Sequence, residues 1–489
     1  MEAGLAAGLN TVNQILSAGI AITAFSLLLY ALSFNLRERV SRSFAMILAC
    51  MVVIFTAKSI GSTVENPGFL TFWLRLQWVG IIPLPAAYLH FSDALLSTTG
   101  RPSRGRRLWA VRLTYLFSVF LLVALLLGIL VGPLVPDAYP APYLRANIFT
   151  ELFTLYYAGI ILVAWVNFAR AYSRTTTPTS RRRMLYLLAG ATAPALGSYP
   201  YLIFGYEFAA AVPGLFWVLV TISNFLVGTL IVVMAYSVAF FGVPWPDRVV
   251  RSRLFKWLMR GAVTASVTLT LTTLVRRAGA AFGTVYTALV PIVMVGVILL
   301  MEYLITLLSP LWDRVLFYGK DRDDLMLLHN LDDRLLTRND LRQFLELVLS
   351  SVCDRLQVKT AFVAALNGNG LELVVKTGEN RFMEDQTMST AMLETVSVQH
   401  EDEELFLWGD YLLMPLKPEE DDNQPAGLVG ILGFSRPENR EIDEEQIGAL
   451  NFLARRAAMA LQDRHLQLQV VQSLQELNPQ IEIIQRLRA

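Results

Sequence analysis

The sequence predicts two unlike parts: an all-α polytopic membrane helix bundle of about nine crossings, then a soluble α+β domain with a C-terminal helix. Three observations support this multi-domain fold class. The 489 residues are 54% hydrophobic and only 17% charged, and their apolar residues gather in long runs, as is typical of membrane proteins. Residues 1–318 hold 24 Lys and Arg against 10 Asp and Glu, whereas residues 319–489 hold 17 against 30. The last third also changes to amphipathic and alternating patterns.

Nine stretches come close to the roughly 20 apolar residues that a helix needs to cross a bilayer. They cover residues 11–33, 43–62, 70–95, 109–132, 148–172, 184–204, 213–241, 255–275 and 283–308. The sequence predicts between seven and nine crossings.

The loops after the first, third, fifth and seventh stretches are basic, whereas the loops after the second, fourth and sixth hold almost no Lys or Arg. The basic clusters are Arg37, Arg39 and Arg42; Arg101, Arg104, Arg106 and Arg107; Arg174, Arg181, Arg182 and Arg183; and Arg248, Arg251, Arg253 and Lys256. We expect an integral protein of the plasma (inner) membrane. Because cytoplasmic loops carry an excess of basic residues, these four loops should face the cytoplasm. The N-terminus is then outside and the acidic last third is inside. Arg276 and Arg277, in a short outer loop, disagree with this assignment.

The soluble part begins with a Leu-rich amphipathic segment, residues 319–337, that predicts a linker helix. The next helix has a start signal, because Thr337 stands three residues before Asp340 in an arrangement like a capping box. Apolar residues then repeat at helical spacing and predict one buried face. They are Leu341, Phe344, Leu345, Val348, Leu349, Val352 and Leu356.

Two strand pairs follow this helix. Residues 359–366 and 371–377 flank Asn367-Gly368-Asn369-Gly370, in which Asn and Gly supply the positive φ of a hairpin turn. Residues 411–417 and 426–435 form the second pair, around an acidic loop. A long helix over about 442–477 then completes an α+β domain of ordinary size.

Two parts of the chain resemble known families. The segments FWLRLQWVGIIPLPAAYLHFSDALL (72–96) and AYSRTTTPTSRRRMLYLLAGATAPALGSYPYLI (171–203) resemble the seven-helix membrane region at the N-terminus of some bacterial histidine kinases. Residues 411–466, with the preceding helix and hairpin, look like a GAF domain, a cytoplasmic module for ligand binding or dimerisation. The resemblances divide the chain into a seven-helix sensor-like region (1–242), two additional membrane helices (243–318), the linker (319–337), the GAF-like domain (338–466) and a C-terminal signalling-type helix and tail (467–489).

The resemblances imply a receptor for signal transduction, as in a two-component system, but the catalytic half of a histidine kinase is not recognisable. His465 lacks the acidic residue, basic residue and proline that follow a phosphoacceptor histidine, and the Asn- and Gly-rich boxes that hold ATP are missing. We therefore expect no enzyme activity and no catalytic residue. The output would pass to a partner kinase or response effector, or to a downstream segment outside this chain. No cofactor is evident, and the ligand of the GAF-like domain stays unidentified.

Polar and amphipathic side chains near the outer ends of four stretches form a candidate ligand site. They are Lys58, Arg75, Gln77, Trp78, Glu151 and Tyr199. Ionisable groups within membrane spans are costly and often functional, so these side chains could line an outward-facing pocket. The alternative is that the charged side chains extend to the interface and the aromatic ones form the usual interfacial belt.

Three ionisable residues fall inside predicted spans. His90 and Asp93 are three residues apart and share a helix face, which predicts a hydrogen-bonded pair that fixes helix packing, with a proton switch as the alternative. Two ligands do not make a metal site, and no metal is expected. Glu302 either pairs with another helix or marks a functional site.

The closing helix suggests a homodimer, because its apolar residues continue beyond any plausible domain core. They are Ile447, Leu450, Leu453, Ala457, Leu461, Leu468, Val471 and Leu474. Packing of the first half of this helix on the domain's own sheet is an equal alternative. The expected partners are the lipid bilayer and a second copy, with no nucleic acid. A transporter or channel with a regulatory domain is the second functional class, although no inverted repeat is evident.

Overall fold

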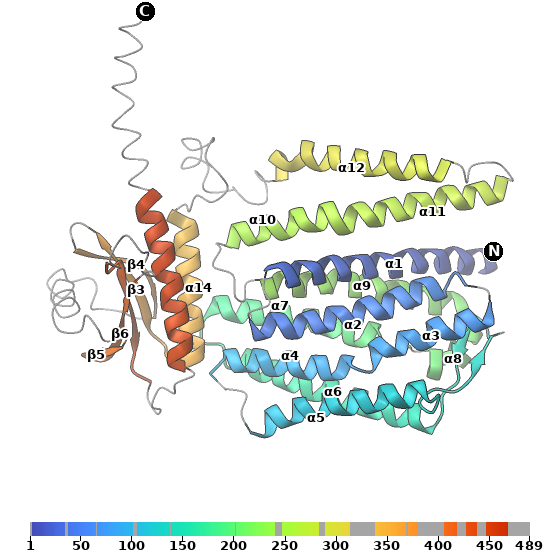
Figure 1. Cartoon of the computed structure of the whole chain (residues 1–489), viewed down its shortest axis with the longest axis horizontal. Coiled ribbons are helices and arrows are strands. Elements are labelled where there is room, and N and C mark those ends of the chain that lie inside the picture. Colours follow the sequence, from blue (N-terminus) through green and yellow to red (C-terminus); the bar gives the residue numbers. More distant parts are fainter. Residues whose placement is uncertain are drawn as a thin grey trace, which may run out of the picture.

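A computed structural model of the chain describes residues 2–34, 38–64, 66–100, 105–136, 138–200, 202–239, 247–282, 289–312, 338–367, 370–378, 405–417, 427–437 and 446–467. These residues form a helix bundle and, at one end of it, a smaller domain built on a β-sheet (Figure 1). The predicted linker helix (319–337) lies outside the described residues, and so does the predicted tail from residue 468 onward.

Eight spans within the described residues are long and apolar enough to cross a membrane. They are α1 (Glu2–Phe34), α2 (Arg39–Gly61), α3 (Pro67–Ile81) continued by α4 (Leu84–Thr98), α5 (Arg106–Leu126), α6 (Ile148–Ser173), α9 (Pro213–Ala239), α10 (Asp247–Leu258) continued by the π-helix η1 (Met259–Val263) and α11 (Thr264–Phe282), and α12 (Val290–Trp312). Their length and composition indicate a helical membrane bundle, as the sequence predicts.

A further helix, α7 (Pro178–Gly197), packs against α9 within the bundle but is not among these spans. Arg181, Arg182 and Arg183 in its first turns lower its hydropathy. The predicted sixth crossing at 184–204 therefore corresponds to a helix that begins earlier and ends at Gly197.

Proline and glycine account for two further departures from the predicted spans. The third predicted helix is divided between α3 and α4, because Pro83 and Pro85 lack the N–H groups that an unbroken helix would use. A short helix, α8 (Leu202–Ala211), follows α7, and its helical geometry is interrupted at Gly205. A two-stranded ribbon of β1 (Leu134–Val135) and β2 (Tyr143–Leu144) connects α5 to α6.

Aromatic residues from several helices fill the centre of the bundle. Phe91 on α4 packs against Phe44 on α2 and Phe168 on α6, with ring centroids 6.0 and 5.7 Å apart. All three side chains are buried, and they belong to one continuous apolar core with Met51 and Tyr88. Close packing of this kind holds membrane helices together, because lipid is as apolar as the side chains it would replace.

The smaller domain contains α14 (Arg338–Leu356), a five-stranded antiparallel sheet and a helix over 446–467. The strands are β3 (Ala361–Asn367), β4 (Gly370–Thr377), β5 (Phe406–Trp408), β6 (Tyr411–Leu416) and β7 (Gly430–Ser435), in the spatial order β4-β3-β7-β6-β5. Both predicted strand pairs are confirmed, with Val363 opposite Val375 in the first and Met414 opposite Leu432 in the second. We call this part of the chain the sheet domain.

Both helices of the sheet domain pack on the same face of the sheet. All seven apolar residues predicted to form one face of α14 are buried, and they share a core with Leu450, Ala457 and Leu461 of the helix 446–467. The first half of the closing helix thus packs on its own domain, which was one of the two predicted alternatives. In Figure 1 the two helices stand between the sheet and the bundle.

The basic loops and the sheet domain lie at the same end of the bundle (Figure 1). Arg39 begins α2, Arg107 lies in the first turn of α5, and Arg174 follows α6. We call the end with these arginines the basic end, and the end where the N-terminus lies the opposite end.

Candidate functional site

Lys58 lies in a polar cluster between α1, α2 and α9. Its Nζ atom donates a hydrogen bond of 3.3 Å to Oδ1 of Asn224 and lies 5.4 Å from the centre of the Phe55 ring. Nδ2 of Asn224 donates to Oδ1 of Asn13 at 3.0 Å, and Nδ2 of Asn13 donates to Oγ1 of Thr221 at 2.9 Å. Both asparagines are buried. Because buried polar groups are costly unless they are hydrogen-bonded, this network ties the three helices together.

Other residues of the predicted outer site have separate partners. Trp78 is buried and packs edge-on against Phe153 of α6, with ring centroids 5.5 Å apart. The neighbouring Gln77 is also buried. The hydroxyl of Tyr199 shares a short hydrogen bond with that of Thr154. These contacts belong to the packing of α3, α6 and the segment after α7.

The remaining two residues of that prediction are less buried. Glu151 is exposed in the first turn of α6, where a carboxylate favours the positive end of the helix dipole. Arg75 on α3 is half-buried. Among the described residues, Lys58, Trp78 and Tyr199 thus contact different partners, namely Asn224, Phe153 and Thr154.

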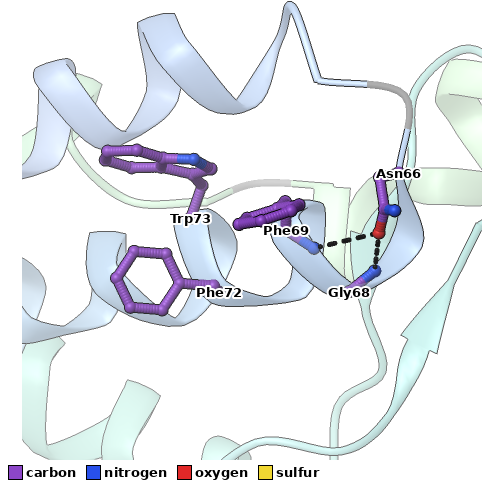
Figure 2. Close-up of a pocket in the computed structure, with 5 residues that line it drawn as sticks. All are labelled: Asn66, Gly68, Phe69, Phe72 and Trp73. Carbon is purple, nitrogen blue, oxygen red and sulfur yellow. Dashed lines mark hydrogen bonds between the residues drawn. The ribbon is translucent and has the colours of Figure 1, made fainter.

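A shallow apolar pocket of about 490 Å³ lies beside the first turns of α3, at the opposite end of the bundle (Figure 2). It is lined by Asn66, Gly68, Phe69, Phe72 and Trp73. Asn66 caps α3, since its Oδ1 accepts from the backbone N–H groups of Gly68 and Phe69. With Oδ1 of Asn66 used in this way, most of the remaining pocket surface is apolar and comes from Phe69, Phe72 and Trp73.

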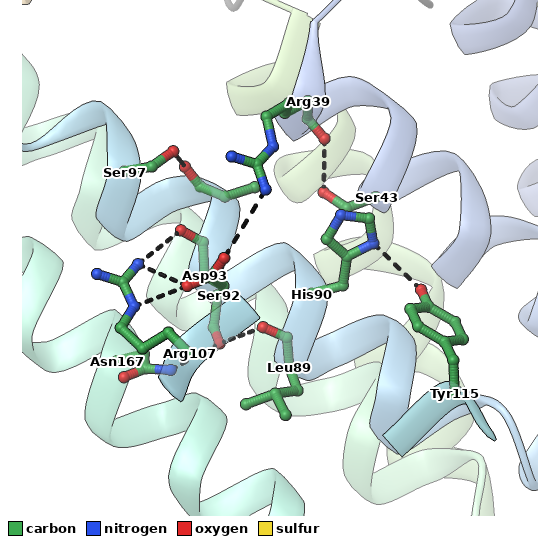
Figure 3. A network of polar contacts seen from close by, with 11 residues as sticks. Arg39, Ser43, Leu89, His90, Ser92, Asp93, Ser97, Arg107, Tyr115 and Asn167 are labelled. Carbon is green, nitrogen blue, oxygen red and sulfur yellow. Dashed lines mark hydrogen bonds and ion pairs between the residues drawn. The ribbon is translucent and has the colours of Figure 1, made fainter. Parts of the chain in front are cut away.

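Asp93 connects three helices at the basic end (Figure 3). Its carboxylate is almost fully buried and forms an ion pair with Arg107, whose Nε lies 2.7 Å and Nη2 2.5 Å from Oδ1. The same guanidinium donates to the Asp93 carbonyl oxygen at 3.2 Å, and Nη2 of Arg39 lies 4.0 Å from Oδ2. A buried carboxylate needs such partners to remain charged, so this cluster fixes α2, α4 and α5 relative to one another.

His90 has a hydrogen-bond partner other than the predicted Asp93. Nδ1 of His90 instead shares a hydrogen bond of 3.2 Å with the hydroxyl of Tyr115 on α5, and their rings pack edge to face (Figure 3). Asp93 is already engaged by Arg107, which holds its carboxylate toward α5. Both residues do fix helix packing, as expected, but through different partners.

Glu302 forms an ion pair with another helix, which was one of its two predicted roles. Its Oε1 lies 3.3 Å from Nε of Arg260 in the π-helix η1. Both side chains are about half exposed.

The sheet domain meets the basic end through the last turn of α14. Oδ1 of the buried Asp354 accepts hydrogen bonds from the backbone N–H and the hydroxyl of Thr176, each 2.7 Å long. Nε2 of Gln357 donates to the carbonyl oxygens of Thr99 and Arg174, at 3.4 and 3.2 Å. Gln357 has a φ of 57°, unusual for a residue other than glycine. The loops after α4 and α6 are thus bonded to the sheet domain, and we call these contacts the joint.

Two further observations show that the sheet domain and the bundle are close together at the joint. Gly100 has a φ of +76°, and a Cβ atom there would lie 2.5 Å from the carbonyl oxygen of Arg355. Any side chain at this position would therefore push α14 away from the loop. Burial lowers the pKa of the Arg456 guanidinium, and the charge of Glu38 before α2 opposes that shift. The helix 446–467 therefore also approaches the bundle.

Sequence reasoning missed the joint, although two weak signals were present. Asp354 is an acid beside the buried face of an amphipathic helix, and Thr175-Thr176-Thr177 is a polar run in an otherwise basic loop. Neither pattern is specific, because acids and threonines are common on exposed helix faces and in loops.

Among the described residues, no group of three His, Cys, Asp or Glu could hold a metal ion. The polar clusters of the bundle are hydrogen-bonded networks that connect helices, and the joint connects them to a second domain. The chain matches no protein-family model, no curated protein and no solved structure.

Proposed function

We propose that this chain is a membrane-embedded sensory receptor whose helix bundle passes a stimulus to the sheet domain, with no catalysis of its own. The stimulus arrives from outside the cell or from within the membrane. The output passes to a separate effector, such as a partner kinase. The joint is the observation that supports this function best.

The joint couples the two domains because its bundle side consists of loops that end membrane spans. Thr99 directly follows α4, and Arg174 and Thr176 follow α6. A shift of either helix along its axis must therefore move α14 or break the hydrogen bonds of Asp354 and Gln357. A receptor of this kind needs an element with two arrangements that the stimulus favours differently. We assign that role to the joint, which is either closed or open.

The sheet domain is proposed to be GAF-like and to act in the cytoplasm. The likeness of residues 411–466 to GAF domains supports this, and so does a five-stranded antiparallel sheet covered on one face by its first and last helices. The arginines at the basic end support the cytoplasmic orientation, because positive loops remain inside. The likeness of residues 10–242 to kinase-associated sensor regions supports a role in signal transduction.

The test is to change a residue in the bundle and to measure hydrogen exchange in the sheet domain. Asn224→Ala removes the hydrogen-bond partner of Lys58 without touching the sheet domain. We would reconstitute the full chain in lipid nanodiscs and follow hydrogen exchange of α14 and of the helix 446–467 by mass spectrometry. Glu151→Gln, which alters an exposed side chain in the same bundle, is the matched control.

We expect Asn224→Ala to change exchange in the last turn of α14, and Glu151→Gln to leave it unchanged. The change should disappear when Asp354→Ala opens the joint beforehand. Identical exchange in the sheet domain of Asn224→Ala and the unmodified chain would count against coupling between the domains. An effect that persists with the joint open would show that coupling follows another route.

A further inference from the structure

Among the residues that the structure describes, α12 lies at the edge of the bundle and has few neighbours (Figure 1). It contacts α11 and η1, whereas the α10–η1–α11 helix packs against α1 on its other side. Figure 1 shows α12 as the edge of the bundle. Val297 and Ile305 are its buried large side chains, whereas many others are more than 40% exposed. The exposed ones are Ile292, Met294, Val295, Ile298, Leu299, Leu300, Tyr303 and Leu307.

The ion pair between Arg260 and Glu302 lies on this exposed edge. Arg260 lies in η1 and Glu302 in α12, both within spans that are long and apolar enough to cross a membrane. Their side chains are 59% and 53% exposed. Charged side chains within membrane spans almost always face other protein or water rather than lipid, so we expect this edge to contact another protein.

The charges and apolar side chains at this edge indicate which protein binds there. The pair carries one cation and one anion side by side, so its net charge is zero and it needs no charged partner of either sign. Under a two-fold rotation the same pair is complementary to itself, because each Arg260 can meet the other copy's Glu302. Val295, Leu299 and Thr306 stand seven and three residues before and four residues after Glu302, on the same exposed helix face. Val295 and Leu299 supply apolar surface beside the charges, whereas the hydroxyl of Thr306 donates to the backbone carbonyl of Glu302.

We propose that α12 and the Arg260–Glu302 pair form a two-fold interface between two copies of this chain within the membrane. Each guanidinium then contacts two carboxylates, one from each copy, and lipid is excluded from all four charges. This surface is separate from the C-terminal helix, and the inference does not depend on the proposed receptor function.

Charge exchange between two differently tagged full-length chains tests the interface. One chain carries Arg260→Glu and therefore two acids at the edge; the other carries Glu302→Arg and therefore two arginines. Within either chain the pair is repulsive, but across a two-fold interface the two variants are complementary. We would co-express the chains, extract them with their lipid in polymer-bounded nanodiscs, and measure capture of one tag by the other. Tryptophan fluorescence on heating would establish that each variant is folded.

We expect the mixed combination to be captured at least about tenfold more than either variant with itself, because like charges across an interface cost several kcal/mol. The matched control exchanges Arg342 and Glu346, an exposed ion pair on α14, and should leave all captures equal. Equal capture of every combination at the edge would place the contact between chains elsewhere. A monomeric unmodified chain, or failure of the mixed pair to associate, would also overturn the proposal, and a different membrane protein would then bind at this edge.

Discussion

Asp354→Ala is the most direct perturbation of the joint. The substitution removes a carboxylate oxygen that accepts two hydrogen bonds of 2.7 Å from Thr176. Hydrogen bonds to charged groups contribute about 1.5 to 3 kcal/mol each when buried. Thr176 itself is exposed, and water can replace its lost partner, so we expect closure of the joint to weaken by about 2 to 4 kcal/mol in total.

This loss corresponds to about a 30-fold to 1000-fold shift toward the open joint. The backbone amide of Thr176 reports on it, because this N–H donates to Asp354. Its hydrogen exchange in nanodiscs should accelerate by a comparable factor, provided exchange requires opening of the joint. Glu346→Ala, on the exposed face of the same helix, is the control and should change nothing. If exchange of the Thr176 amide accelerates less than about threefold, Asp354 contributes less to closure of the joint than we assign to it. Gln357 would then be the main contact.

Three other substitutions or treatments have expected outcomes. Asp93→Asn should lower the free energy of unfolding of the bundle by about 2 kcal/mol, because it unpairs a mostly buried Arg107; unchanged melting by tryptophan fluorescence would contradict this. Burial and the neighbouring Asp354 raise the pKa of the Cys353 thiol to about 12. A maleimide should therefore label Cys353 at neutral pH only after the sheet domain unfolds. Rapid labelling of Cys353 in the native chain would count against the packing of α14. Partial desolvation raises the pKa of the largely exposed Asp463 carboxyl above its unfolded value, so its charged form opposes folding weakly at neutral pH. Asp463→Asn should therefore raise the melting temperature slightly at pH 7, and the gain should shrink as the pH falls through the raised pKa. A gain in melting temperature that is the same at pH 7 and at a pH below the raised pKa would disprove that origin.

The secondary structure was largely predictable because periodicity reports burial directly. The apolar spacing in α14 predicted its buried face residue by residue, and the Asn-Gly turn predicted the pairing of β3 with β4. The strand β5 was missed because it has only three residues before the Gly409-Asp410 turn, too few to show alternation. The division of the third span was missed because prolines are tolerated within membrane helices and do not always break them.

The candidate site was predicted less well because sequence gives depth in a membrane but not lateral neighbours. Lys58, Arg75 and Tyr199 were predicted to lie at similar depth, but which helices touch is decided by packing over the whole bundle. Asn224, the observed partner of Lys58, is 166 residues away in the chain. No local pattern encodes such a contact, and the same is true of Thr176 and Asp354.

The order of strands in the sheet has a consequence for biosynthesis. The central strand β7 is the last strand of the sheet in the chain and pairs with both β3 and β6, so the sheet is incomplete until Ser435 has left the ribosome. Thr176, by contrast, is translated 178 residues before Asp354, an interval of about 9 to 36 s at ordinary elongation rates. The membrane spans can therefore insert and assemble while their basic end is still empty. The sheet domain then docks last, onto a surface that is already formed.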